Sequence, residues 1–217
     1  LDHAARATLE KMGSGTSVTE AGSDSTDLAG AARIAPIVYL YRDQSERLIE
    51  AAHAQTALTH NSAIVTQTSE FLARVLWRVL NGKTPTGAVA TVLGESTSPE
   101  VAALVRTGLE SVERESAGVA LEFGQNCSVS AALPLTVHLI AKYEGSLRSA
   151  LVENVGLGGD SAARGLVVGM VLGAFHGSDA IPDEWIEQML AYKEITALLE
   201  DLESSVQKGS RSSANTY

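Results

Sequence analysis

The residues best suited to chemistry form one short turn, in which Gly158 and Gly159 precede Asp160 and Ser161. Two successive glycines permit backbone conformations closed to other residues and let a ligand approach closely. An aspartate after such a turn stands where a helix begins. Its carboxylate can cap the helix, which is the commonest use of an aspartate after a glycine turn, or contact a ligand. The turn therefore predicts an acidic ligand-binding corner.

The segment after this turn must hold Asp160 in place. Glycine recurs every fourth residue, at Gly165, Gly169, Gly173 and Gly177. On a helix this spacing forms a single stripe, against which another helix can lie at close range. We interpret the stripe as a packing surface that fixes the corner in a helical core.

Helical periodicity dominates the rest of the chain. Apolar residues repeat at helical spacing over 64–80, where Asn81 and Gly82 supply a stop. Proline at a first turn predicts further helices from Pro99 to about Gly118 and from Pro182 to a point before residue 208. A helix over 129–143 contains Pro134, which should kink it or delay its start.

These patterns predict one all-α domain with a compact multi-helix fold over residues 1–204. A short helix over 1–12 leads into a loop rich in Gly, Ser and Thr over 13–30. Residues 205–217 are rich in serine and poor in apolar side chains, which is typical of a disordered tail. No stretch alternates like a β-strand over a useful length.

Composition excludes several classes of function. The chain has 217 residues, with 16 Lys and Arg against 26 Asp and Glu, for a formal net charge of -10. This charge disfavours a general surface for nucleic acids or anionic membranes. The longest apolar run, over 165–175, is about half of what a membrane span requires. The single cysteine, Cys127, cannot form an intrachain disulfide and favours a reducing compartment, by default the cytoplasm. An organelle stays open, because the chain begins at Leu1.

Several short motifs in a fixed order resemble the ADP-ribosylglycohydrolase family, most closely its branch that contains the J1 crystallins. In chain order they are GSDS (22–25), ARIAP (32–36), LTHN (58–61), FGQNC (123–127), GGD (158–160) and IPDEW (181–185).

This resemblance implies an all-α hydrolase fold whose active members use two magnesium ions to cleave the bond between ADP-ribose and its acceptor. Breaking a bond at the anomeric carbon creates oxocarbenium character. Carboxylates can stabilise this positive charge, and metal-bound water can attack the carbon. Asp160 matches the family's C-terminal metal-binding acid. The resemblance also implies an ADP-ribose-like ligand in contact with Ser23, Asp24, His60, Gly124, Cys127, Gly159 and Ser161.

The sequence departs from the family pattern at two points. The family's C-terminal motif has a second carboxylate two residues after the first, where this chain has Ala162. The family's N-terminal acidic cluster, which supplies further metal ligands, has no counterpart, so we expect that the family's N-terminal segment is missing. With fewer oxygen ligands, magnesium should bind weakly.

Each remaining candidate also has a structural interpretation. Asp24, Ser25 and Asp27 are residue types that favour turns, because their side chains bond to nearby backbone. His60 fits a buried hydrogen bond near a helix start. Cys127 fits a small core residue better than a nucleophile. Arg164 could bind a phosphate, but an intrachain partner such as Glu153 is favoured.

Three functions are consistent with the sequence. The first is a magnesium-dependent hydrolase of ADP-ribosyl or related glycosidic bonds. The second is a catalytically inactive, crystallin-like structural or binding protein. The third is a subunit of a homo-oligomer or of a larger assembly, since a domain without the family's first helices should expose apolar surface that a partner covers.

Overall fold

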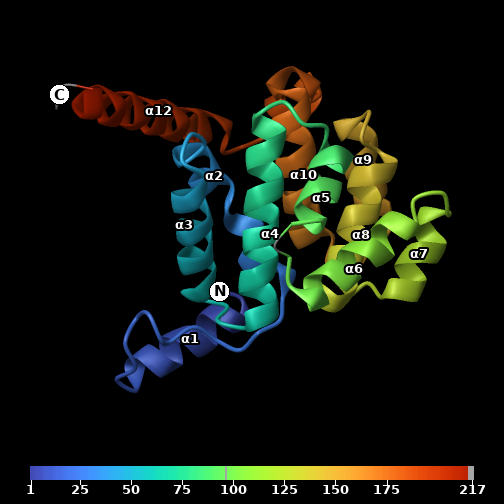
Figure 1. Ribbon diagram of the computed structural model, residues 1–217, viewed down its shortest axis with the longest axis horizontal. Coiled ribbons are helices and arrows are strands. Elements are labelled where there is room, and N and C mark those ends of the chain that lie inside the picture. The colour runs from blue at the N-terminus through green and yellow to red at the C-terminus, as the bar shows by residue number, and fades with distance from the viewer. Residues whose placement is uncertain (96, 215–217) are drawn as a thin grey trace. The chain divides into compact units, whose positions relative to one another are not determined.

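The structure is a computed structural model that describes residues 1–95 and 97–214, with side chains through residue 204. Within these residues the chain forms α-helices and two short 3-10 helices, and its only β-structure is two isolated bridges (Figure 1). The predicted all-α fold is confirmed. The elements are α1 (His3–Gly13), η1 (Leu28–Arg33), α2 (Ala35–Leu40), α3 (Ser45–Ala57), α4 (Ala63–Leu80), α5 (Pro85–Leu93), α6 (Pro99–Glu110), α7 (Ser116–Phe123), α8 (Val129–Lys142), α9 (Leu147–Gly156), α10 (Ser161–His176), η2 (Ser178–Ala180), α11 (Asp183–Glu187) and α12 (Tyr192–Ala214).

The chain divides into two compact units, Leu1–Ala180 and Ile181–Tyr217. The first contains α1 to α10 with both 3-10 helices, and the second contains α11 and α12. The sequence patterns predict no boundary at this point. All of the motif residues that lie before residue 181 fall in the first unit.

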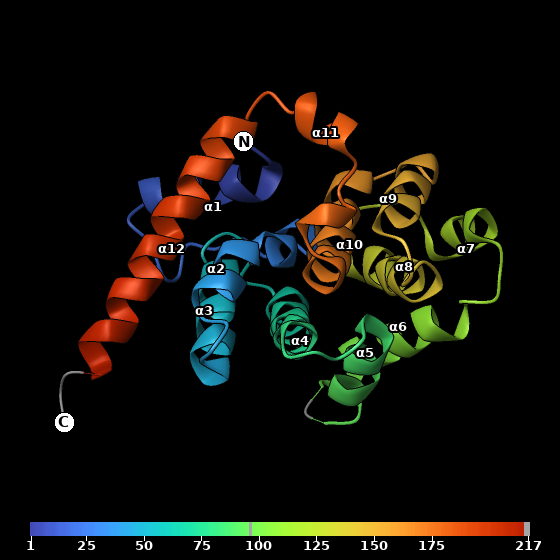
Figure 2. The same cartoon turned by 90° about the horizontal axis from the view of Figure 1, so that it is seen from above.

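The core of the first unit is built around α8, which lies amid α6, α7, α9 and α10 (Figure 2). Every residue from Ala131 to Ile140 is buried. Pro134 stands inside this helix and does not delay its start at Val129. The backbone donor that proline lacks would bond to the carbonyl of Ser130, an exposed residue of the first turn where water can replace the missing donor.

The helix predicted from Pro99 to about Gly118 is wrong in its second half. Helix α6 ends at Glu110, and α7 begins at Ser116. The two serines at the break turn inward to a buried imidazole: Ser111 Oγ lies 2.8 Å from His138 Nδ1, and Ser116 Oγ lies 3.0 Å from His138 Nε2. Local side-chain bonds of this kind compete with helix continuation.

The C-terminal region also differs from expectation. The predicted long helix after Pro182 is divided into α11 and α12, and the backbone of α12 is helical through Ala214. It therefore passes through most of the segment expected to be disordered, while residues 215–217 lie outside the described residues. Once a helix exists, each added residue costs little, and Gly209 disfavours helix by only about 1 kcal/mol relative to alanine.

The glycine stripe on α10 makes only part of the predicted contact. A Cβ on Gly165 would lie 3.0 Å from Asn154 Nδ2, and one on Gly169 would lie 3.8 Å from Leu151 Cδ2, so both glycines face α9. A Cβ on Gly173 would meet nothing within 4 Å, and Gly177 is the cap that ends the helix. Close packing is thus limited to the N-terminal half of α10, next to Asp160.

None of the helices in the described part of the chain is both long enough and apolar enough to cross a membrane.

Candidate functional site

Three loops that are distant in sequence meet at the start of α10. The amide of Leu28 donates to the carbonyl of Cys127 over 2.8 Å, and the amide of Val129 donates to the carbonyl of Thr26, also over 2.8 Å. The amide of Asp160 donates to the carbonyl of Gln125 over 3.0 Å. The loop before α8 therefore connects the other two. We call residues 24–27, 125–128 and 158–161 together the Asp160 corner.

The glycine turn fits against the central loop without space for a side chain. Gly159 has a φ of +63°, and a Cβ built on it would lie 2.0 Å from the carbonyl oxygen of Gln125. Only glycine satisfies both the backbone conformation and this close approach. The Gln125 side chain also donates from Nε2 to the carbonyl of Leu157, which ties the loop to the end of α9. The position of Asp160 is thus set by backbone contacts on both sides.

Asp160 caps α10, as one of its two interpretations predicts. Its Oδ1 accepts the amide of Ala163 at 3.4 Å, a long bond that leaves most of the carboxylate's hydrogen-bonding capacity for other partners. Asp160 and Ser161 are half-buried, whereas Ala162 is exposed. The methyl group of Ala162 therefore faces solvent.

A second carboxylate reaches the corner from another loop. The nearby carboxylate of Asp27, together with burial and the negative charge of Asp160, raises the pKa of Cys127 to about 11. The thiol is therefore neutral at physiological pH. This environment disfavours a nucleophilic cysteine, as the sequence predicts, because the thiolate is the reactive form. It also places Asp27 and Asp160 near one side chain.

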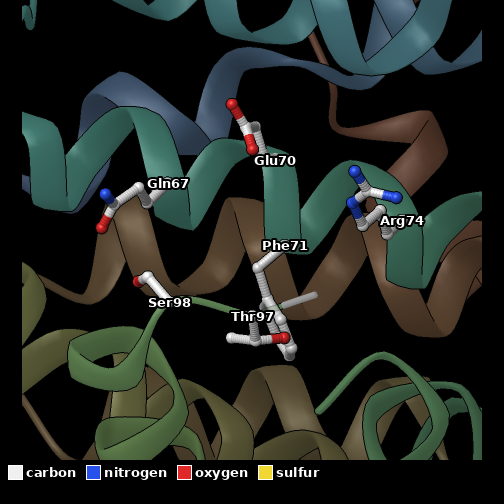
Figure 3. A pocket seen from close by; sticks show the side chains of 6 residues that line it. All are labelled: Gln67, Glu70, Phe71, Arg74, Thr97 and Ser98. Atoms are coloured by element: carbon white, nitrogen blue, oxygen red, sulfur yellow. The ribbon is translucent and has the colours of Figure 1, made fainter. Parts of the chain in front are cut away.

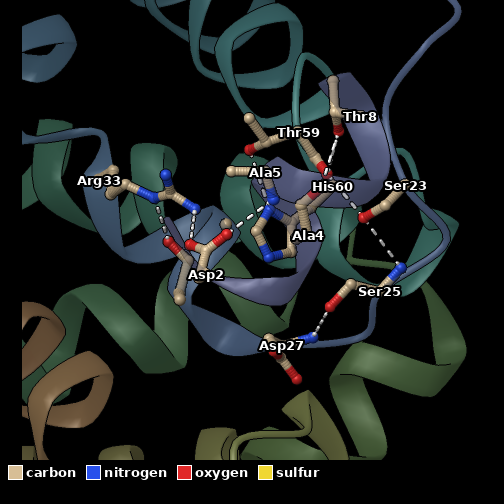
Figure 4. Close-up of polar contacts among 12 residues, drawn as sticks. Asp2, Ala4, Ala5, Thr8, Ser23, Ser25, Asp27, Arg33, Thr59 and His60 are labelled. Carbon is tan, nitrogen blue, oxygen red and sulfur yellow. Dashed lines mark hydrogen bonds and ion pairs between the residues drawn. The ribbon is translucent and has the colours of Figure 1, made fainter. Parts of the chain in front are cut away.

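Ser23 and His60 form a pair beside the corner (Figure 4). They belong to a parallel bridge, and the amide and Oγ of Ser23 both donate to the carbonyl of Thr59, over 3.0 and 2.8 Å. His60 is only 1% exposed, and its Nδ1 lies 2.9 Å from Thr59 Oγ1. A Cβ on Gly30 would lie 2.6 Å from His60 Cγ, so η1 packs directly on the imidazole.

The electrostatics of His60 connect this pair to the corner. Burial and the nearby guanidinium of Arg33 lower the pKa of His60, while the carboxylates of Asp2 and Asp27 act in the opposite direction. Asp2 itself caps α1 through the amide of Ala5 at 2.7 Å and pairs with Arg33 at 3.4 Å (Figure 4). His60 is thus neutral near pH 7, which agrees with a buried, hydrogen-bonded role.

The structure brings some predicted site residues together and separates others. Cys127, Gly159, Asp160 and Ser161 lie in the corner, and Ser23 and His60 lie beside it. Asp24 is exposed, while Ser25 Oγ accepts the amide of Asp27 at 3.3 Å, as the turn interpretation of Ser25 predicts. Gly124, with a φ of +93°, ends α7 just before the central loop.

Sequence reasoning missed three residues of the site. It did not single out Gln125 or Asn154, and it favoured a turn-forming role for Asp27 over a substrate contact. Asp27 meets Cys127 across about a hundred residues of chain, so no local pattern could reveal the contact. The expected pairing of Arg164 with Glu153 is wrong: its partners are Asn154 Oδ1 at 3.1 Å and the carbonyl of Gly158 at 2.5 Å. A side chain on the first turn of α10 leans toward the N-terminus of the helix and therefore toward the glycine turn.

Several cavities lie outside the corner. One, of about 330 Å³, is lined mostly by polar side chains of α4 and of the segment before α6 (Figure 3). Its lining residues are Gln67, Glu70, Phe71, Arg74, Thr97 and Ser98. Another, of about 240 Å³, is an apolar groove among α2, α4 and α10 that Gly169 and Gly173 help to line. Neither of these two cavities includes a residue that the sequence predicts to bind a ligand.

Comparison with known proteins agrees with the motif order. The family model for ADP-ribosylglycohydrolase matches residues 1–211. Human ADP-ribosylhydrolase ARH3 is 24% identical over 220 residues, which cover 86% of this chain and 60% of ARH3, so the chain spans about three fifths of that relative. A solved structure described as an ADP-ribosylglycohydrolase-related protein complex matches with a TM-score of 0.76 and 24% identity, over 93% of this chain and 68% of that one. At this identity the structural match shows the fold. Because the family model matches nearly the whole length of the chain, the chain belongs to the ADP-ribosylglycohydrolase family.

Proposed function

We propose that this chain binds ADP-ribose, or a related nucleotide sugar, at the Asp160 corner and hydrolyses a glycosidic bond to it. The observation that carries the proposal is the meeting of two distant loops on the segment before α8: Asp27 forms a bridge with Ser128, and the amide of Asp160 donates to the carbonyl of Gln125. Family membership supplies the class of substrate. ARH3, by its name an ADP-ribosylhydrolase, is a relative with the same kind of substrate.

The corner offers suitable chemistry for such a ligand. A carboxylate close to the anomeric carbon stabilises the positive charge that develops as the glycosidic bond breaks. The start of α10 favours the negative charge of a diphosphate, because the positive end of the helix dipole lies there. Because Asp27 raises the pKa of Cys127, the thiol is neutral and does not compete as a nucleophile.

The donors present fit one magnesium ion better than two. Among the described residues, no group of three or more His, Cys, Asp and Glu side chains is placed to hold a metal ion. Magnesium is commonly held by one or two carboxylates together with substrate phosphates and water. Asp27 and Asp160 would supply the carboxylates, and a nucleotide diphosphate the remainder. Bound there, the ion would neutralise phosphate charge and polarise water. We therefore expect magnesium to bind together with ADP-ribose and only weakly without it.

Release of ADP-ribose from an ADP-ribosylated substrate tests the proposal. We expect multiple turnovers in millimolar magnesium and a loss of at least about tenfold in kcat/KM in Asp160→Asn, since removing one charged contact costs about 1.5–3 kcal/mol. Glu50→Gln, which removes an exposed charge on α3, is the matched control and should leave the rate unchanged. Equal rates in the wild-type chain and Asp160→Asn would sink the proposal.

A specific observation favours a second candidate, a non-catalytic binding protein. The exposed Ala162 removes one carboxylate that the family motif carries. If this candidate holds, the wild-type chain releases no ADP-ribose at any magnesium concentration but still binds it. Ala162→Asp would then strengthen magnesium-dependent ADP-ribose binding, while Ala162→Asn, of the same size, would not.

A further inference from the structure

A buried arginine lies directly behind the Asp160 turn. Arg164, on the first turn of α10, is 0% exposed. Its Nη2 donates to the carbonyl of Gly158 at 2.5 Å, and its Nε donates to Asn154 Oδ1 at 3.1 Å. The guanidinium is thus hydrogen-bonded to the backbone two residues before Asp160.

Asn154, on α9, is hydrogen-bonded to the other end of the same turn. This side chain is 1% exposed, and its Nδ2 donates to the carbonyl of Ser161 at 2.8 Å. Its amide therefore accepts from Arg164 and donates to the backbone just after Asp160. The two side chains form a continuous hydrogen-bonded clamp across residues 158–161.

Stability alone does not explain an arginine at this position. Burying a guanidinium is costly, and an apolar side chain of similar volume is often as stabilising or more so. The cost is not fully compensated, because Arg164 Nη1 is buried without a hydrogen-bond partner. Burial accordingly lowers the pKa of Arg164, and the charge of Asp160 opposes that effect. A charged group kept at such a cost points to a role beyond packing.

We propose that Arg164 and Asn154 are positioning residues that hold the 158–161 backbone so that the Asp160 carboxylate faces the ligand. Arg164 acts through the turn and does not itself contact the ligand, because it is fully buried. This inference rests on the proposed function for its link to ADP-ribose. The clamp itself can be tested without any ligand.

The first measurement is amide hydrogen exchange, read at the Asp160 amide that bonds to Gln125. The variants are Arg164→Met and Asn154→Ala, so that one informative variant remains if the other does not fold. Val105→Ala, a cavity-forming change in α6, is the control for general destabilisation, and the Leu76 amide in the middle of α4 reports global opening. We expect exchange at Asp160 to accelerate by at least about tenfold relative to Leu76 in both clamp variants and not in the control. Unchanged relative exchange in the clamp variants would overturn the proposal.

The second measurement is ADP-ribose affinity by calorimetry in a double-mutant cycle. Arg164→Met should weaken binding by about tenfold or more in the wild-type background and by less than about twofold in Asp160→Asn, because its effect passes through Asp160. Equal losses in both backgrounds would contradict a positioning role.

The conservative variant separates geometry from charge. Arg164→Lys keeps the positive charge but has a single donor nitrogen and cannot bond to Asn154 and Gly158 as the guanidinium does. It should therefore recover only part of the ADP-ribose affinity that Arg164→Met loses. Full recovery would show that charge suffices and would overturn the clamp. If the wild-type chain does not bind ADP-ribose, the proposed function fails, and hydrogen exchange alone decides the clamp.

Discussion

Substitution of Gly159 by alanine should destabilise the fold more than any other single methyl addition on the Asp160 turn. The structure gives two independent reasons. A non-glycine residue with a φ of +63° costs about 1–2 kcal/mol. The new Cβ would lie 2.0 Å from the Gln125 carbonyl oxygen, so the loops must separate and the bond from the Asp160 amide, which is worth about 0.5–1.5 kcal/mol, weakens or breaks. Together they predict a loss of about 1.5–3.5 kcal/mol of stability.

Gly173→Ala, on the α10 helix that follows the turn, is the matched control. A Cβ there meets nothing within 4 Å, and the backbone is already helical, so alanine should stabilise the fold by up to about 1 kcal/mol. Urea denaturation followed by circular dichroism measures both changes as shifts of the midpoint at constant slope. A Gly159→Ala variant within about 0.5 kcal/mol of the wild-type chain would refute the described contact between the turn and the central loop.

Two further predictions concern titration and reactivity. Burial, together with the nearby positive charge of Lys142, lowers the pKa of His138 from 6.5 to about 4. The neutral imidazole therefore stabilises the fold fully above pH 6.5, and about 3 kcal/mol of this stability is lost as the pH falls toward 4. The free energy of unfolding, measured by urea denaturation, should depend less on pH over this range in His138→Gln. An equal pH dependence in the two proteins would show that His138 is not the titrating group. Because Asp27 raises the pKa of Cys127, Asp27→Asn should accelerate alkylation of Cys127 at pH 8 by roughly tenfold or more. The control Asp24→Asn should leave the alkylation rate nearly unchanged. Alkylation at the wild-type rate in Asp27→Asn would contradict the proximity of Asp27 to Cys127.

Much of the fold follows from local patterns in the sequence. The apolar repeat before Asn81 predicts α4 within about one residue of its ends, and the first-turn prolines locate the starts of α6 and α11. The break between α6 and α7 could not be predicted this way. It depends on Ser111 and Ser116 both bonding to His138, a residue that lies on another helix.

The residues of the candidate site likewise fall into those that a local pattern reveals and those that act through tertiary contacts. Gly159 and Asp160 are recognisable because a glycine turn before a helix start is a local feature. Asp27 and Asn154 are not, since each acts through a tertiary contact: Asp27 with Cys127, and Asn154 with Arg164. The burial of Arg164 likewise depends on how α9 and α10 pack, which the glycine stripe only partly indicates.

The central claim is that the Asp160 corner binds ADP-ribose, and calorimetric titration of ADP-ribose in the presence of magnesium tests it most directly. The wild-type chain and the Glu50→Gln control should bind with equal affinity, and Asp160→Asn should bind at least about tenfold more weakly. Omission of magnesium should weaken binding to the wild-type chain and change binding to Asp160→Asn much less. Equal ADP-ribose affinity in the wild-type chain and Asp160→Asn would contradict the assignment of this corner as the ligand site.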